Sequence, residues 1–414
     1  MLPGNRLSSC LMKARFCSVL ALVSAGAILA GSSDWPQWRG PSKNSEIAPG
    51  KAIEWSKLSD SKIAWEINVG IGYSSLSVVD GRAYTMGHDG KDNETIYCLD
   101  AKTGKEIWTH SYPAKLMPAM HVGGPNATPT VHEGAVYVMS KDGQIFALDA
   151  DKGQLRWSAN LEELLGIKTP TWGYASSPVV LGERVLFSAG RVVALDRNTG
   201  KMAWISENTY HPGYATPVVF ENGTDSILAA FDGKGVSLHH ALSGEEIARH
   251  GFKTQYDMTA TDPIVAQDGE HIFVSSMSQG ELLKFDGSKL ASVWSGRSMR
   301  NSMNASTLLG GHLYGVDGRH KSNRSRFACV RLSDGETVWA KEDFGYATQI
   351  LVGEHLVVLS EAGELVVVAP STEGYREVSR KKVLDSICWT PPSYADGLLF
   401  VRNDVGRALA VQLH

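Results

Sequence analysis

Along most of the chain, short apolar runs end in a polar turn and continue into a second run that carries a tryptophan. The clearest copies are "CLDAKTGKEIW" (98–108), "ALDADKGQLRW" (147–157) and "ALDRNTGKMAW" (194–204). In each copy an alternating apolar run ends in Leu-Asp, and a glycine stands four residues before the tryptophan. Asp hydrogen-bonds its own backbone in a turn, and Gly takes the positive φ that closes it. Each copy therefore predicts a β-hairpin.

Weaker copies of the hairpin continue to the end of the chain. With the tryptophan, or the residue in its place, as the marker, successive copies lie 39 to 49 residues apart. A period of about 40 to 50 residues built from short strands is typical of a propeller. We expect the tryptophans to pack between neighbouring blades, where a large ring fills the gap between sheets. These structural tryptophans are Trp65, Trp108, Trp157, Trp204, Trp294 and Trp339.

A second motif, made of small residues, opens each unit before an apolar strand and a glycine-containing turn. Eight openings occur, from "GYSS" (72–75) to "WTPPSYA" (389–395). One unit is then four antiparallel strands, which is a propeller blade. The last unit ends at "ALAVQLH" without a fourth strand, and "SKIAWEINV" (61–69) offers one. We therefore predict an all-β, eight-bladed β-propeller of four-stranded antiparallel blades over residues 61–414, closed by pairing of the N- and C-terminal strands.

The N-terminal residues predict export. Basic residues precede an apolar run of fifteen residues, "FCSVLALVSAGAILA" (16–30), that ends in small side chains. A transmembrane helix needs about 20 apolar residues, so we interpret residues 1–31 as a signal peptide; a retained anchor is the alternative. We expect residues 32–60 to be a leader segment that packs on the propeller. The mature chain would be periplasmic or secreted, without a membrane span.

Composition excludes several classes of function. The net charge of −4 gives no bulk attraction to nucleic acid. Only Cys98, Cys329 and Cys388 follow the signal, so disulfides do not form the framework. The histidines have no metal-ligand spacing, and nucleophile and phosphate-loop motifs are absent. We therefore predict no metal site and no catalytic residue, and we expect a monomer.

The repeat with its docking tryptophan resembles that of the quinoprotein-like (PQQ-binding-like) propeller family. The segment "DWPQWRGP" (34–41) is similar to the leader of many exported members. The family includes alcohol dehydrogenases that use pyrroloquinoline quinone (PQQ) and non-enzymatic propellers such as BamB. For a dehydrogenase the resemblance implies an adjacent cysteine pair, a Glu/Asn/Asp set on calcium and an aromatic floor. The chain has no adjacent cysteines and no recognisable calcium loop.

Candidate ligand contacts lie at the blade openings, because the ends of the innermost strands converge on the channel mouth. Rigid aromatics with polar tips suit a flat ligand, a sugar ring or a peptide. Tyrosines that recur in phase with the repeat favour a role in plugging the channel, so the positions that break the pattern are the better candidates. The candidates are Tyr73, Asn126, Trp172, Tyr174, Tyr214, Asp262, Asn304, Tyr346 and Trp389.

Two hypotheses for function follow. The first is an exported, non-catalytic propeller that binds or scaffolds other envelope or secreted proteins, without a cofactor. The second is a PQQ-dependent dehydrogenase of the alcohol or polyvinyl-alcohol type, with PQQ and Ca²⁺ as cofactors. A basic cluster, "GRHKSNRSR" (318–326), is interpreted as a solvated loop, with docking of an acidic partner as the alternative.

Overall fold

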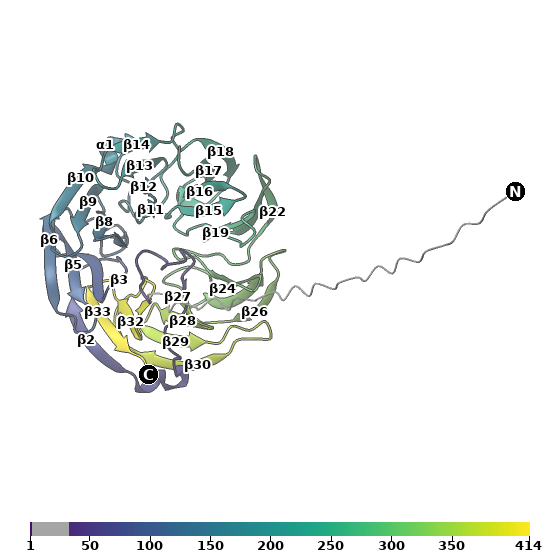
Figure 1. Ribbon diagram of the computed structural model, residues 1–414. Coiled ribbons are helices and arrows are strands. Elements are labelled where there is room, and N and C mark those ends of the chain that lie inside the picture. Colours follow the sequence, from purple (N-terminus) through teal and green to yellow (C-terminus); the bar gives the residue numbers. More distant parts are fainter. Residues whose placement is uncertain (2–32) are drawn as a thin grey trace. The chain divides into compact units, whose positions relative to one another are not determined.

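The structure is a computed structural model that describes Met1 and residues 33–414; the predicted signal peptide over 1–31 lies, apart from Met1, outside the described residues. Residues 33–414 form a ring of eight antiparallel four-stranded blades, as the repeat predicts (Figure 1). In each blade the first strand lies nearest the centre of the ring and the last strand lies at the outside. The predicted fold class is confirmed.

The blades follow one another along the chain. Those of the first half are β3 (Ser77–Val79), β4 (Arg82–His88), β5 (Asn93–Asp100) and β6 (Glu106–Pro113); β7 (Thr130–His132), β8 (Ala135–Met139), β9 (Gln144–Asp149) and β10 (Leu155–Asn160); β11 (Val179–Leu181), β12 (Arg184–Ser188), β13 (Val192–Asp196) and β14 (Met202–Ile205); and β15 (Val218–Asn222), β16 (Asp225–Asp232), β17 (Gly235–His240) and β18 (Glu246–Gly251). Those of the second half are β19 (Ile264–Val265), β20 (His271–Ser275), β21 (Gly280–Phe285) and β22 (Leu290–Gly296); β23 (Thr307–Leu309), β24 (His312–Asp317), β25 (Arg326–Arg331) and β26 (Thr337–Lys341); β27 (Ala347–Val352), β28 (His355–Ser360), β29 (Glu364–Val368) and β30 (Glu377–Lys382); and β31 (Ser393–Ala395), β32 (Leu398–Arg402) and β33 (Arg407–Gln412).

The eighth blade takes its outer strand from the N-terminal part of the chain. Strand β2 (Lys62–Asn68) pairs antiparallel with β33, from Lys62 opposite Gln412 to Asn68 opposite Arg407. Figure 1 shows the purple β2 beside the yellow β33 at the edge of the ring. The pairing leaves no open blade at the junction of the two ends, which confirms the predicted closure.

The recurring tryptophans dock most of the blades on the next. Trp108 Nε1 donates a hydrogen bond to Ala150 O (2.9 Å), and Trp157 Nε1 donates to Arg197 O (2.9 Å). The ring of Trp108 lies over Gly153, where an added Cβ would stand 2.5 Å from it. Trp204 lies in the same way over Gly244. The motif therefore needs both the ring and the bare glycine.

The leader packs on the inner strands of the ring. Trp35 is 2% exposed and exchanges two backbone hydrogen bonds with Val78 of β3. Further along, β1 (Glu46–Ile47) pairs in parallel with β27 in the seventh blade. The 3₁₀ helix η1 (Trp55–Asp60) then leads to β2 at the outside of the ring, beside β30. The leader thus runs from the first blade across the centre of the ring to its rim (Figure 1).

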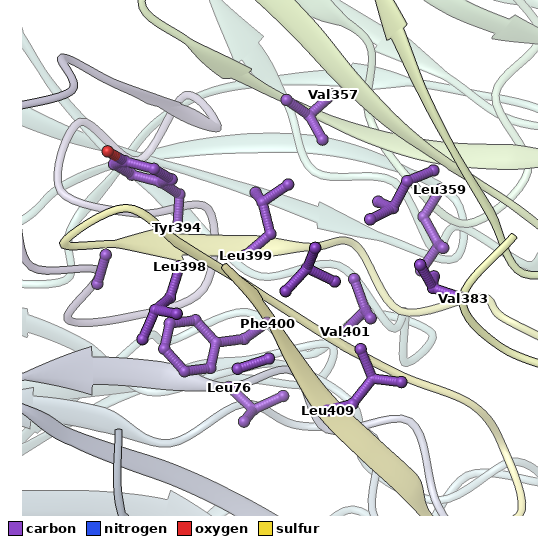
Figure 2. Close-up of a cluster of buried hydrophobic side chains, with 14 of the residues drawn as sticks. Leu76, Val357, Leu359, Val383, Tyr394, Leu398, Leu399, Phe400, Val401 and Leu409 are labelled. Carbon is purple, nitrogen blue, oxygen red and sulfur yellow. The ribbon is translucent and has the colours of Figure 1, made fainter. Parts of the chain in front are cut away.

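Apolar side chains fill the space between neighbouring blades. At the closure, side chains of β32 and β33 such as Leu399 and Leu409 pack between Leu76 before β3 and Val357 of β28 (Figure 2). All four are at most 1% exposed. Burying such a side chain stabilises the fold by about 1.5–3 kcal/mol, so these contacts help to hold the ring closed.

Helices play little part in the structure. The α-helix α1 (Leu161–Leu165) is one short turn capped by the Asn160 side chain, and η2 (Gln255–Asp257) is shorter still. None of the described helices has the length and apolar character that a membrane span requires. The cysteines Cys98, Cys329 and Cys388 are buried and free.

Candidate functional site

A belt of hydrogen bonds joins the first five blades where their innermost strands begin. The backbone N–H of Ser75 donates to Thr128 Oγ1, that of Thr128 to Ser177 Oγ, and that of Ser177 to Thr216 Oγ1, each at 3.0 Å. In the next step the N–H of Thr216 donates to Asp262 Oδ1 (2.8 Å). Asp262 therefore stands where the preceding blades carry a hydroxyl group. This is the position at which the opening motif departs from its pattern.

Contacts with the leader account for the carboxylate at position 262. Trp38 Nε1 donates to Asp262 Oδ2 (2.5 Å), and Arg39 Nη1 lies 3.9 Å from the same oxygen. The side chains of Arg39 and Asp262 are each 5% exposed. Burial raises the pKa of Asp262, whereas the charge of Arg39 and the Trp38 hydrogen bond lower it. Both oxygens of the carboxylate are therefore engaged: Oδ2 holds the leader to the fifth blade, and Oδ1 continues the belt from Thr216.

Above Trp38 the channel opens into a cavity of about 600 Å³. Its walls are mainly aromatic and methionine side chains, with a few amide and hydroxyl groups between them. This size and composition are typical of a site for a small ligand or for an inserted side chain. The methionines that line it are Met120, Met258, Met277 and Met303.

A stacked aromatic pair forms one wall. The rings of Tyr73 and Trp389 are nearly parallel, with centroids 5.4 Å apart. His320 meets Trp389 edge-on at 4.9 Å, and Trp389 Nε1 donates to Glu361 Oε1 (2.5 Å). Burial raises the pKa of Tyr73, so its hydroxyl stays protonated at neutral pH. The pair is a rigid, uncharged surface.

Two histidines at the cavity are uncharged at neutral pH. Burial, together with the nearby lysines Lys141 and Lys321, lowers the pKa of His121 to about 4. Burial also lowers the pKa of His320. His121 Nδ1 accepts from the N–H of Gly123 (3.0 Å), which fixes its orientation. Both rings therefore act as polar walls rather than as cations.

The structure brings most of the residues proposed from sequence to this cavity. Tyr174 and Tyr346 do not line it. Tyr174 is 1% exposed and donates its hydroxyl to Ile167 O (2.8 Å). Tyr346 is 2% exposed, and its hydroxyl accepts from Asn304 Nδ2 (3.0 Å). The proposed residues that do line the cavity are Tyr73, Asn126, Trp172, Tyr214, Asp262, Asn304 and Trp389.

Sequence reasoning missed other residues of the lining. The sequence marks Trp38 only as part of the leader, whereas the structure places its ring against Asp262 and leaves Trp35 beside β3. Tyr256 and Arg319 belong to loops between strands, outside the repeat. Arg319 lies in the basic cluster at 318–326, which the sequence predicts to be a solvated loop, and no local pattern marks Tyr256. The methionines carry no motif either. These lining residues could have been found only from the amino-acid composition of the loops, because the repeat does not include them.

Comparison with known proteins identifies a family and several relatives that are similar to this chain. Residues 92–341 and 232–373, which together span more than half of the chain, match the family described as outer membrane protein assembly factor BamB. The BamB of Burkholderia pseudomallei is 24% identical over 294 residues, covering 68% of this chain and 69% of that protein. The quinohemoprotein alcohol dehydrogenase ADH-IIG of Pseudomonas putida is 26% identical over 201 residues.

The dehydrogenase match is partial. It covers 44% of this chain and only 27% of the dehydrogenase. The solved structure of ADHIIG from Pseudomonas putida superimposes with a TM-score of 0.70 at 13% identity, over 93% of this chain and 81% of that chain, which shows a shared fold. Repeat, ring and family match agree: the chain belongs to the family of the outer membrane protein assembly factor BamB.

Proposed function

We propose that this chain is a non-catalytic binding protein of the cell envelope, periplasmic or secreted, which holds other proteins as a monomeric scaffold. The similarity to BamB supports this assignment. The cavity at the channel mouth would be its binding site, with Tyr73, Asn126 and Trp389 among the contacts. The proposed residues Trp172, Tyr214, Asp262 and Asn304 complete that site, with Tyr174 and Tyr346 supporting it from behind.

The engagement of Asp262 carries the proposal. Among the described residues that line the cavity, Asp262 is the only carboxylate. Its oxygens already accept from Trp38 and Thr216, and it pairs with Arg39. A general base needs a free oxygen within reach of its substrate. The nearby His121, with a pKa of about 4, is a weak base at best.

The alternative is a PQQ-dependent dehydrogenase, and the aromatic walls favour it. The stacked pair of Tyr73 and Trp389 and a volume of about 600 Å³ suit a flat quinone. Calcium fits poorly, because it takes 6–8 oxygen ligands with several carboxylates. Asp262 is committed to the leader, and residues 33–414 contain no group of three Asp, Glu, His or Cys side chains placed so that they could hold a metal ion. The residues present therefore fit the ring system but not its metal.

A titration with PQQ and Ca²⁺ tests the two assignments. A ligand at about 100 times its Kd stabilises the folded protein by roughly 2.7 kcal/mol, which raises Tm by several degrees. For a non-catalytic protein we expect no saturable change in Tm or tryptophan fluorescence, and no reduction of an electron-accepting dye when primary alcohols are added. Saturable binding accompanied by dye reduction would replace the proposed function by the dehydrogenase.

A further inference from the structure

Three loops from different parts of the ring surround the cavity mouth. Residues 114–129 connect β6 to β7, residues 252–263 connect β18 to β19, and residues 318–325 connect β24 to β25. The first and third loops meet where Lys321 Nζ donates to Met120 O (3.1 Å). The mouth is therefore framed by segments that lie outside the repeat.

Two large apolar side chains on these loops face water. Met120 is 86% exposed and Tyr256 is 74% exposed, the highest values for large apolar side chains within residues 33–414. Both also line the cavity. Tyr256 has φ +64°, a left-handed conformation that is unfavourable for a bulky residue. An apolar rim continuous with an apolar cavity marks a surface that a larger partner covers.

The rim carries an uncompensated positive charge. Arg319 lines the cavity, is exposed, and has no ion-pair partner within the described part of the chain. Lys321 stands 5.3 Å above the Trp389 ring, and its own backbone N–H donates to Glu361, which does not line the cavity. The one acidic group of the lining, Asp262, is already paired with Arg39. A ligand that brings a carboxylate to Arg319 would neutralise this charge.

A small molecule would cover only part of this apolar surface. Held inside the cavity, it would leave Met120 and Tyr256 in water. An extended segment that enters the cavity with one side chain and lies across the mouth would cover both. Methionine side chains adapt to varied shapes, which suits a peptide side chain better than one rigid ligand.

We propose that the cavity mouth docks an extended segment of a partner protein, inserting a large apolar or aromatic side chain between Trp389 and Tyr214 and presenting a neighbouring acidic residue to Arg319. This inference rests on the proposed binding function and names its partner chemistry. It also assigns a role to the basic cluster at 318–326.

A display library of random decapeptides tests the proposal directly. We expect panning on the purified protein to enrich peptides with an aromatic or large aliphatic residue beside Asp or Glu. Synthetic copies of the enriched peptides would bind about tenfold more weakly to Arg319→Glu and to Tyr256→Asn. Asn is chosen because it tolerates the left-handed backbone at this position.

Matched controls separate the site from general charge and apolarity. Arg324→Glu reverses another exposed charge of the same loop outside the cavity lining, and Leu242→Ala removes an exposed apolar side chain in the fourth blade. Both should bind the peptides within about twofold of the unchanged protein. Unchanged Tm in all four variants would show that folding is intact.

The outcomes distinguish this inference from the broader proposal. No enrichment, enrichment without acidic residues, or equal binding by Arg319→Glu and Arg324→Glu would overturn the inferred partner chemistry, while a scaffold acting through another surface would stand. PQQ-dependent alcohol oxidation in the preceding titration would overturn the proposed function itself.

Discussion

All docking tryptophans except Trp339 lie over a glycine of the following blade, and this contact accounts for the recurrence of both residues. Gly153 has φ +66°, and its Cα faces the Trp108 ring so closely that no Cβ fits. The turn before it is held by Asp149, which accepts from the N–H groups of Asp151 and Lys152. The glycine at this position therefore meets two structural requirements: it adopts the left-handed turn, and it leaves a flat surface for the tryptophan ring.

A pair of substitutions separates the cost of backbone strain from the cost of displacing the tryptophan ring. Gly182 also has positive φ (+52°), but an added Cβ there meets nothing within 4 Å. We expect Gly182→Ala to cost about 1–2 kcal/mol from backbone strain alone. Gly153→Ala should cost about 1–3 kcal/mol more, because the Trp108 ring must move. Urea unfolding of both variants checks this, and equal midpoints would show that the ring contact contributes nothing.

At the scale of the element, the leader holds the fifth blade through a buried ion pair. Arg39 donates to Ser45 Oγ (3.1 Å) and Pro263 O (3.4 Å) and lies beside Asp262. Burial lowers the pKa of Arg39, but the guanidinium stays charged at neutral pH. Removing one member of such a pair leaves the other charge buried and costs about 3–5 kcal/mol.

A double-substitution cycle tests this element. Asp262→Thr keeps an acceptor for the Thr216 N–H, as in the preceding blades, but leaves Arg39 unpaired. We expect it, and Arg39→Met, to destabilise the fold by several kcal/mol each. The combined Arg39→Met/Asp262→Thr variant should be nearer to the original protein than Asp262→Thr alone. Simple additivity of the two free-energy changes would show that the pair is not coupled.

On the scale of the whole molecule, one buried arginine ties the last blade to the first. Arg402 of β32 is fully buried and donates to Met86 O (2.6 Å), Gly70 O (2.9 Å) and Ser74 O (3.2 Å). Burial lowers its pKa to about 10, so it is charged at neutral pH. Its guanidinium therefore ties the eighth blade to backbone carbonyls at residues 70–86, in and before the first blade.

Replacing Arg402 should therefore weaken the closure strongly. Arg402→Met leaves several buried carbonyls without donors, at about 1–3 kcal/mol each. The control is Arg407→Met on β33, which breaks the exposed pair with Glu66 and should cost no more than about 1 kcal/mol. Hydrogen exchange would locate the effect: early exposure of β2 and β33 in Arg402→Met is expected, whereas uniform exchange would contradict it.

Sequence reasoning reached the ring but only part of the site. The eight blades and their closure were predictable because every blade must repeat the same hairpin to pack on its neighbour. Tyr174 and Tyr346 share the motif position of Tyr73 and Tyr214 but do not line the cavity, since hydrogen bonds to Ile167 and Asn304 hold them behind it. Whether a repeated side chain faces the channel depends on loops that the repeat does not encode.

The pairing of β2 with β33 also imposes an order of events on a chain made from its N-terminus. Strand β2 emerges early and finds its partner only when residues up to Gln412 have followed, some 340 residues later. Until then the unpaired strand is free to pair with other chains, the hazard of any open sheet edge. Seven blades can assemble while β2 is still unpaired, so the ring is complete only when β33 has been made and pairs with it.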